Sequence, residues 1–239
     1  MSLLELSELH TYYGLAYVLQ GISLACEEGE AVALLGRNGQ GKTTTIKSIM
    51  SLVVPRRGRV MFLGKNIAGW PPHVISRKGI SVVPESRRIF PALSVLDHLR
   101  VPVAPPQVDR AERLKFVFDL FPELRTKKNE NARDLSGGQQ QMLVIARALM
   151  MKPRLLLLDE PMEGLSPKLI KRVIEALTII QDNGVTIFFA STNCELAFRI
   201  ANRAYIIEKG RIVHHAGRDE LLGDVEVQRH YLGVRGQKK

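Results

Sequence analysis

The segment Gly36-Arg37-Asn38-Gly39-Gln40-Gly41-Lys42-Thr43 fits the pattern G-x-x-x-x-G-K-[ST] at every position. It follows the short apolar run Ala31–Leu35, which is typical of a strand buried on both faces, and it precedes a helix predicted over about residues 43–52. In that context the glycines let backbone N–H groups surround phosphate oxygens at a helix N-terminus. The pattern predicts that Lys42 contacts the β- and γ-phosphates of a nucleotide, with support from Arg37. It also predicts that the Thr43 hydroxyl binds Mg²⁺ and that Thr44 contacts the α-phosphate.

A second apolar run, Leu155–Leu158, ends at Asp159 and Glu160. Because ligands of open α/β sheets bind at the carboxyl ends of the strands, this run predicts two acids beside the phosphate-binding loop. We expect Asp159 to hold Mg²⁺, directly or through water. Glu160 is expected to orient or deprotonate the attacking water.

A third motif, Leu135-Ser136-Gly137-Gly138-Gln139, opens a helix predicted over about residues 139–151. The Ser136 hydroxyl and the amides of two glycines at a helix start predict a second anion-binding site. A flexible helix cap is the simpler interpretation of such a segment. Its place shortly before the strand that carries Asp159 favours the anion site.

Predicted strands and helices alternate on both sides of a helical stretch. Further strands are predicted at residues 3–6, 22–26, 59–63, 79–83, 185–190 and 204–208, and helices at about 167–181 and 195–201. Between about Ser94 and Met151 the apolar spacing is helical, and Asp109 is placed to cap one helix. We predict one α/β domain over residues 1–239, with a core of residues 1–86 and 153–239 and a helical subdomain of residues 87–152.

The chain carries an excess of basic residues, 34 Lys and Arg against 24 Asp and Glu, for a net charge of +10. Nucleic acid, an anionic membrane surface and phosphate-rich ligands are the partners that such an excess favours. A hydrophobic content of 45% is that of a globular protein and excludes intrinsic disorder. The apolar runs are far shorter than the ~20 residues that cross a bilayer, and no signal peptide is predicted. Cys26 and Cys194 are predicted to be free thiols in a reducing, cytosolic compartment.

The three motifs together carry a family resemblance. Gly36–Thr43, Leu135–Gln139 and Leu158–Pro161 resemble the motifs of the ATP-binding-cassette ATPases, whose signature sequence is LSGGQ. The resemblance covers essentially the whole chain. It implies a P-loop NTPase (RecA-like) core with an antiparallel β subdomain, and it implies ATP and Mg²⁺ as cofactors of an ATPase. It also implies a head-to-tail dimer, in which Ser136–Gln139 of one subunit faces the γ-phosphate bound by the other.

Further positions match or depart from the family pattern. Tyr13 resembles the aromatic residue that stacks on adenine, although a strand-edge tyrosine is the alternative. Glu163–Pro167 resembles the loop that crosses the dimer interface. Glu85 replaces the usual glutamine and can still bind Mg²⁺ through oxygen. Thr192 stands where the family has a histidine that senses the γ-phosphate, and it can donate a hydrogen bond but carries no charge. We therefore expect slower hydrolysis with ATP binding retained.

These departures narrow the resemblance to one group. Val83–Pro91, Thr192-Asn193, Asp159–Leu165 and Tyr231–Gly233 resemble the ATPases of bacterial importers for branched-chain and related hydrophobic amino acids. That resemblance implies a peripheral subunit on the cytoplasmic face of the inner membrane. Its implied partners are integral membrane permease subunits, a second ATPase subunit in a homodimer or heterodimer, and indirectly a periplasmic binding protein. Importers of urea and short amides, and the lipopolysaccharide-transport ATPase, are close alternatives.

Two other classes of function are alternatives to the importer: a soluble cassette ATPase and a nucleotide-binding regulator. A soluble cassette ATPase acting on DNA or ribosomes usually carries a second cassette or extra domains, and the chain has no predicted nucleic-acid surface. A regulator with degraded catalysis is favoured weakly by Glu85 and Thr192 and opposed by Glu160. We assign part of the +10 charge to polyphosphate binding and the rest to docking beneath an anionic leaflet.

Overall fold

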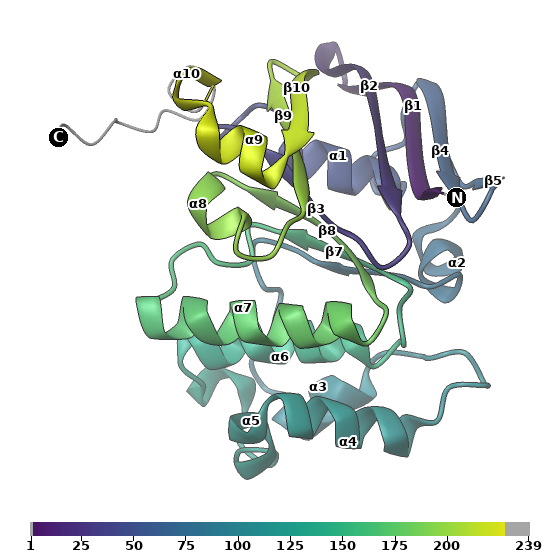
Figure 1. Cartoon of the computed structure of the whole chain (residues 1–239). Helices are drawn as coiled ribbons and strands as arrows, with labels where there is room; N and C mark the ends of the chain where they lie inside the picture. Colours follow the sequence, from purple (N-terminus) through teal and green to yellow (C-terminus); the bar gives the residue numbers. More distant parts are fainter. Residues whose placement is uncertain (1, 228–239) are drawn as a thin grey trace, which may run out of the picture.

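The computed structural model describes residues 2–227, which form two sheets and the helices around them (Figure 1). The first sheet is antiparallel, with the strand order β2-β1-β4-β5, and the second has the order β10-β9-β3-β8-β7-β6. The strands are β1 Ser2–Tyr13, β2 Ala16–Glu27, β3 Ala31–Leu35, β4 Arg57–Phe62, β5 Lys65–Asn66, β6 Ile80–Val83, β7 Leu155–Asp159, β8 Thr186–Ser191, β9 Arg203–Glu208 and β10 Arg211–Gly217. In the second sheet β3, β6, β7, β8 and β9 run parallel, and β10 closes one edge antiparallel to β9.

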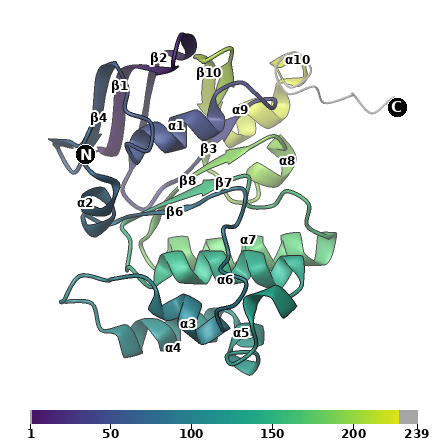
Figure 2. The ribbon, with the colours of Figure 1, turned by 180° about the vertical axis from the view of Figure 1, so that it is seen from behind.

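Helices cover both faces of the six-stranded sheet (Figures 1 and 2). They are α1 Lys42–Ile49, α2 Pro72–Arg77, α3 Val95–Arg100, α4 Arg110–Leu120, α5 Pro122–Thr126, α6 Gly137–Leu149, α7 Pro167–Asp182, α8 Cys194–Ala197, α9 Arg218–Gly223 and α10 Val225–Val227, with a 3₁₀ turn at Ala132–Asp134. Figures 1 and 2 place α1 between the two sheets, and α6 and α7 on the opposite face of the six-stranded sheet, with α3, α4 and α5 beyond them. None of the helices in residues 2–227 combines the length and the apolar character needed to cross a membrane.

Strand β7 shows why the central strands are wholly apolar. Successive side chains of a strand point to opposite faces, and both faces of this sheet are covered. Leu156 and Leu158 pack in the cluster formed with α6 and α7, whereas Leu155 and Leu157 pack in the cluster formed with α1 and the antiparallel sheet. The burial of β7 on both faces fixes where its last residue, Asp159, emerges.

Most predicted elements are confirmed, with shifted ends. Asp109 Oδ1 accepts hydrogen bonds from the backbone N–H groups of Ala111 (2.8 Å) and Glu112 (3.2 Å), as expected of a helix cap. The helix predicted at 195–201 is shorter in the structure, where α8 spans Cys194–Ala197. Both cysteines are free and buried. Tyr231–Gly233 lies outside the described residues.

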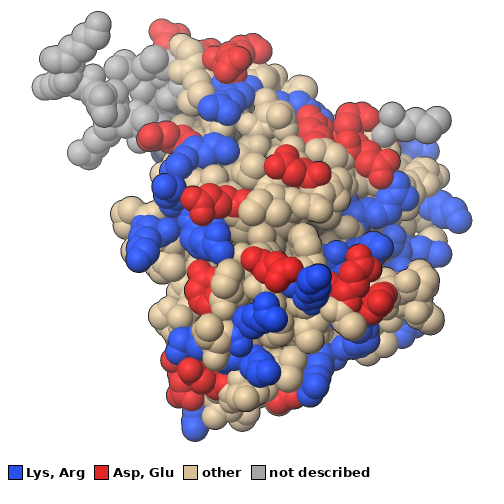
Figure 3. All heavy atoms as spheres, turned by 60° about the horizontal axis from the view of Figure 1, so that its bottom comes forward, with Lys and Arg blue, Asp and Glu red and all other residues tan. Residues whose placement is uncertain are grey.

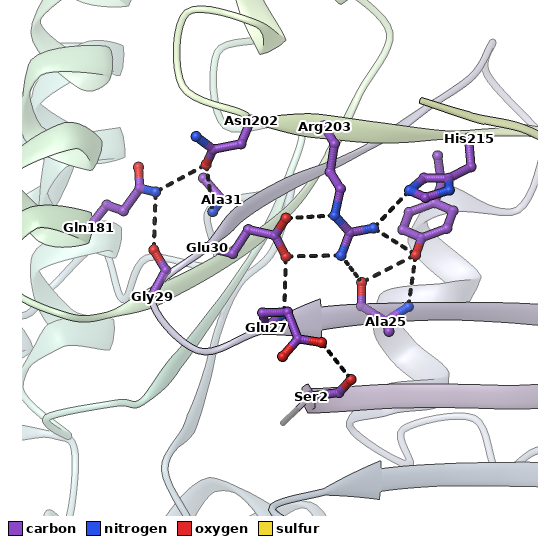
Figure 4. A network of polar contacts seen from close by, with 11 residues as sticks. Ser2, Ala25, Glu27, Gly29, Glu30, Ala31, Gln181, Asn202, Arg203 and His215 are labelled. Atoms are coloured by element: carbon purple, nitrogen blue, oxygen red, sulfur yellow. Dashed lines mark hydrogen bonds and ion pairs between the residues drawn. The ribbon is translucent and has the colours of Figure 1, made fainter. Parts of the chain in front are cut away.

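One polar network ties the two sheets together (Figure 4). The Arg203 guanidinium, on β9, donates to both carboxylate oxygens of Glu30, at 2.6 and 2.9 Å. It also donates to the Ala25 carbonyl on β2 (2.8 Å) and to the Tyr205 hydroxyl (2.7 Å). The ion-paired side chains are only 19% and 17% exposed. A bidentate pair with little access to water contributes more than a surface ion pair does.

We predict that Arg203→Met lowers the free energy of unfolding by about 3 kcal/mol, because it leaves the desolvated Glu30 carboxylate without a cation, held only by the Glu27 N–H at 3.0 Å. Urea denaturation at neutral pH measures this change. Arg154→Met is the matched control, since it removes an ion pair with Glu28 whose side chains are 47% and 58% exposed. The control should lose less than about 1 kcal/mol, and equal losses would contradict the role given to the network.

Candidate functional site

The phosphate-binding loop joins the carboxyl end of β3 to the start of α1, and the packing around it requires glycine. A Cβ atom on Gly36 would lie 2.5 Å from the Ile207 carbonyl oxygen. Gly41 has a φ of +112°, and a Cβ atom there would lie 2.9 Å from Leu19 Cδ2. The loop therefore packs closely against β2 and β9. Its backbone N–H groups lie at the start of α1.

The Lys42 ammonium lies at the centre of this loop and is almost fully buried. It donates to the carbonyl oxygens of Gly36 (2.8 Å) and Arg37 (3.1 Å). It also lies 3.2 Å from Glu160 Oε1, in an ion pair whose side chains are 6% and 8% exposed. A desolvated ammonium needs such partners, so the loop closes around it.

Two acids at the end of β7 face the loop. Asp159 Oδ1 accepts a hydrogen bond from the Thr43 hydroxyl at 3.1 Å. Glu160 has a φ of +47°, in the left-handed region, and its N–H group donates to the Ala190 carbonyl at 3.1 Å. Its Oε2 accepts from the backbone N–H of Thr192 at 3.1 Å. The carboxylate is thus held from two sides, by Lys42 and by the segment after β8.

Lys42, Thr43 and Glu160 open onto a cavity of about 390 Å³, and Asp159 lies buried behind Thr43. The lining of the cavity includes Asn38, Lys42, Thr43, Thr44, Glu85 and Glu160. Burial raises the pKa of Asp159, which the Thr43 hydrogen bond lowers and the negative charges of Glu85 and Glu160 raise further. A hydroxyl and carboxylates gathered in this way fit a hard divalent cation, because Mg²⁺ prefers oxygen ligands and would offset the repulsion among the acids. Thr43, Asp159 and Glu85 are the residues that would hold it.

The signature segment lies apart from this cavity. Ser136 and Gln139 form a reciprocal capping box at the start of α6, in which Ser136 Oγ accepts from the Gln139 N–H and Gln139 Oε1 from the Ser136 N–H. Among the described residues, none from Ser136 to Gln139 lines the cavity that contains Lys42. The two predicted anion sites are therefore not brought together within one chain.

Tyr13 lies at the end of β1 and is 44% exposed. It pairs with Ala16 across the hairpin, on the strand face shared with Val18, which lines the cavity. Tyr12 and Tyr17 occupy the other face, where their rings stack at 4.4 Å between centroids. The alternation thus places Tyr13 on the same side of the hairpin as the cavity that contains Lys42.

Three features of the site are not apparent in the sequence. Gln40, predicted to contact phosphate, accepts through its side chain from the Lys209 N–H (2.5 Å) and through its carbonyl from the Gly210 N–H (3.1 Å). Thr192 contacts Glu160 through its backbone, whereas the sequence pointed only to its hydroxyl. Val18 lines the cavity from a strand with no motif of its own. These contacts join distant segments, so no local pattern signals them.

Residues 19–163 match the family described as ABC transporter. This span, more than half of the chain, contains the loop, the signature and both acids. The chain belongs to the ABC transporter family. It is an ATPase subunit, which hydrolyses ATP to drive transport. ABC ATPase subunits dimerise and pair with permease subunits.

Several relatives match this ABC transporter ATPase over nearly their full length. The high-affinity branched-chain amino acid transport ATP-binding protein BraG of Pseudomonas aeruginosa is 39% identical over 232 residues, covering 97% of this chain and 100% of the relative. The lipopolysaccharide export system ATP-binding protein LptB of Escherichia coli is 35% identical over 243 residues, covering 98% of both. A probable branched-chain amino acid transport protein, LivF of Archaeoglobus fulgidus, is 32% identical and covers 97% of this chain and 99% of the relative.

Solved structures confirm the predicted fold class. A nucleotide-free ATP-binding cassette from an ABC transporter superposes with a TM-score of 0.84 at 23% identity, covering 99% of this chain and 100% of that one. The ATP-binding subunit of another ABC transporter gives a TM-score of 0.80 at 28% identity, covering 99% of this chain and 96% of that one. Both have the two-sheet arrangement expected of a cassette ATPase.

We predict that Asp159→Asn raises the free energy of unfolding at pH 7 by about 1 kcal/mol while hydrolysis is lost, because the amide removes a buried charge repelled by Glu85 and Glu160. Because the pKa of Asp159 is higher in the folded than in the unfolded chain, ionising this carboxyl as the pH rises lowers the stability of the folded state. The gain should therefore shrink as the pH falls and the wild-type carboxyl takes up a proton. Thermal unfolding and ATPase rates over a pH series measure both effects. A variant that is less stable than the wild type at pH 7 would contradict this account.

Proposed function

We propose that the chain powers the uptake of branched-chain or related hydrophobic amino acids, as the ATPase subunit of an importer at the cytoplasmic face of the inner membrane. The observation that carries this proposal is the 39% identity to the Pseudomonas branched-chain amino acid transport protein over its full length. The Archaeoglobus relative supports the same substrate class. Lipopolysaccharide export is the second candidate, because LptB is 35% identical over nearly the whole chain.

The proposed chemistry divides among the residues of the cavity. Gly36–Thr44 holds the phosphates of ATP, and Lys42 exchanges its contacts with Gly36, Arg37 and Glu160 for contacts with phosphate oxygens. Glu160, released from Lys42, accepts the proton of the attacking water. Mg²⁺, held by Thr43, Asp159 and Glu85, would neutralise charge on the phosphates. Tyr13 would stack on the adenine.

The position of the signature segment Ser136–Gln139 favours a dimer. Ser136–Gln139 starts the 13-residue helix α6, where the N–H groups of Gly137 and Gly138 and the helix dipole favour an anion. Because this segment is remote from its own chain's cavity, we propose that it contacts the γ-phosphate bound by a second ATPase subunit. ATP then joins the two subunits, and hydrolysis lets them separate.

The segment Glu85–Pro91 is positioned to couple the cavity to a permease. Arg147 on α6 donates to the carbonyls of Arg88 (3.0 Å) and Arg87 (3.3 Å), and His98 Nε2 accepts from the Phe90 N–H (2.9 Å). A second cavity, the permease groove, lies beside this segment and is lined by Ser76, Ser81, Val82, Arg88, Phe90, Val101, Pro102, Arg147, Ala148 and Met151. We propose that a permease helix binds there, so that movement of Glu85 reaches the membrane subunits.

The uptake of radiolabelled leucine tests the proposed substrate class. In cells lacking the gene for this chain, we expect leucine uptake to fall, and the wild-type gene to restore it. Glu160→Gln is the matched control, because it keeps the fold but should slow ATP hydrolysis at least ~100-fold, and so should not restore uptake. Unchanged uptake of leucine, isoleucine and valine together with failed lipopolysaccharide export would instead favour the second candidate.

The identity of residue 192 sets the expected rate of hydrolysis. We predict that Thr192→His raises turnover about 10-fold, because an imidazole can stabilise developing charge on the γ-phosphate where a hydroxyl donates a single neutral hydrogen bond. The backbone N–H that holds Glu160 is retained in this variant. Steady-state ATPase assays measure the change, and ATP affinity should stay within about threefold of the wild type. An unchanged or lower rate would show that residue 192 acts through its backbone alone.

A further inference from the structure

Three basic side chains without an acidic partner line one cavity. They are Arg77 at the end of α2, Lys78 directly after it, and Lys152 in the turn before β7. All three are exposed, and within residues 2–227 no acidic side chain lies within ion-pair distance of any of them. Over most of the face drawn in Figure 3, Lys and Arg side chains lie among Asp and Glu side chains. The cavity therefore concentrates cationic charge that the chain itself leaves unbalanced.

This basic cavity has a volume of about 620 Å³, within the range of ligand pockets. It lies at the amino ends of β7 and β8, the end of the sheet opposite to Asp159. Figures 1 and 2 both place α2, the loop after α3 and the first turn of α4 on this side of the molecule. Its apolar wall is formed by Val108, Phe116, Pro153 and Val185. It is thus a hollow built from four separate segments of the chain and is distinct from the nucleotide cavity.

The other two cations of the described lining, Arg113 and Arg154, are already engaged. Arg113 donates twice to the Leu149 carbonyl, at 3.1 and 3.2 Å, and Arg154 pairs with Glu28. The one acid of the lining is Glu112. Arg77, Lys78 and Lys152 are therefore the cations that remain available to an incoming anion.

The surroundings favour a phosphate group over a nucleotide. The only aromatic ring of the described lining is Phe116, and the Arg113 guanidinium lies over it at 4.6 Å from the centroid. That face is closed to a stacking base. Lysine and arginine side chains around a hollow still suit the compact charge of a phosphate.

The position of the basic cavity points to the source of that phosphate. Met151 lines both this cavity and the permease groove, and Arg77 directly follows Ser76 of that groove. We propose that Arg77, Lys78 and Lys152 bind the phosphate of an anionic phospholipid headgroup in the leaflet that surrounds the permease. The orientation toward the leaflet rests on the proposed function, whereas the binding itself can be measured with the ATPase subunit alone.

Cosedimentation with lipid vesicles at low ionic strength tests this proposal, using phosphatidylglycerol mixed with phosphatidylcholine against phosphatidylcholine alone. We expect the full chain to bind the anionic vesicles and the triple variant Arg77→Gln/Lys78→Gln/Lys152→Gln to bind on the order of 100-fold more weakly, at about fivefold per basic residue. Both should hydrolyse ATP at the same basal rate, which also shows that the variant folds. If leucine uptake does not depend on this chain, the proposed importer function is wrong. The vesicle-binding results would be unaffected, because they are measured with the ATPase subunit alone.

The matched control removes three exposed basic residues elsewhere, as Arg59→Gln/Lys171→Gln/Arg199→Gln. We expect it to bind the anionic vesicles within about threefold of the wild type. An equal loss in both triple variants would show that net charge alone drives binding and would overturn the assigned site. Equal binding of the wild type to vesicles with and without phosphatidylglycerol would also overturn the site. The same holds if the variant Arg77→Gln/Lys78→Gln/Lys152→Gln still binds anionic vesicles and loses only its binding to the purified permease. Inorganic phosphate that competes at the basic cavity while vesicles do not bind would assign the site to a free anion instead.

Discussion

The buried ammonium of Lys42 is the group around which the site is arranged. Removed from water, it is satisfied by two loop carbonyls and by the Glu160 carboxylate at 3.2 Å. That contact fixes the distance between the loop after β3 and the end of β7, two strands that are separated by β8 in the sheet. The same cation that would neutralise phosphate therefore sets the geometry of the acids that face it. The glycines of the loop, the burial of β7 and the left-handed backbone at Glu160 all serve this one arrangement.

Local patterns predicted the parts of the fold that depend on neighbours in the chain. The buried strands β3 and β7, the loop between β3 and α1 and the caps of α4 and α6 follow from short-range chemistry, and the structure has them all. Strands β1 and β2 are much longer than predicted. Register shifts between Leu6 and Leu9 and between Thr11 and Tyr12 break the alternation that marks a strand. Helix α2 was missed because it is short and begins at a pair of prolines.

The candidate site divides in the same way. The residues of the phosphate-binding loop and the acids after β7 were predicted from two motifs, Gly36–Thr43 and Leu155–Glu160, because each motif lies on consecutive residues. The contacts that join Gln40 to Lys209, Arg203 to Glu30 and Glu160 to Thr192 cross from one segment to another, and the sequence does not encode them as a spacing. The net charge of +10 likewise does not show where on the surface the unpaired basic residues lie. Only the structure separates the paired basic residues from those that line a cavity without partners.

The close packing of Gly138 beneath α7 has a consequence for how two sites in a dimer communicate. A Cβ atom on Gly138 would lie 2.3 Å from Leu169 Cδ1, so the backbone of the signature packs directly against the Leu169 side chain at the start of α7. The start of α7 follows directly on the loop that leaves Glu160. In the proposed head-to-tail dimer, this packing contact in each subunit would link the acid of one ATP site to the signature of the other. Occupancy of the two sites would then be thermodynamically coupled, so that ATP at one site changes the affinity of the other by the same factor in both directions.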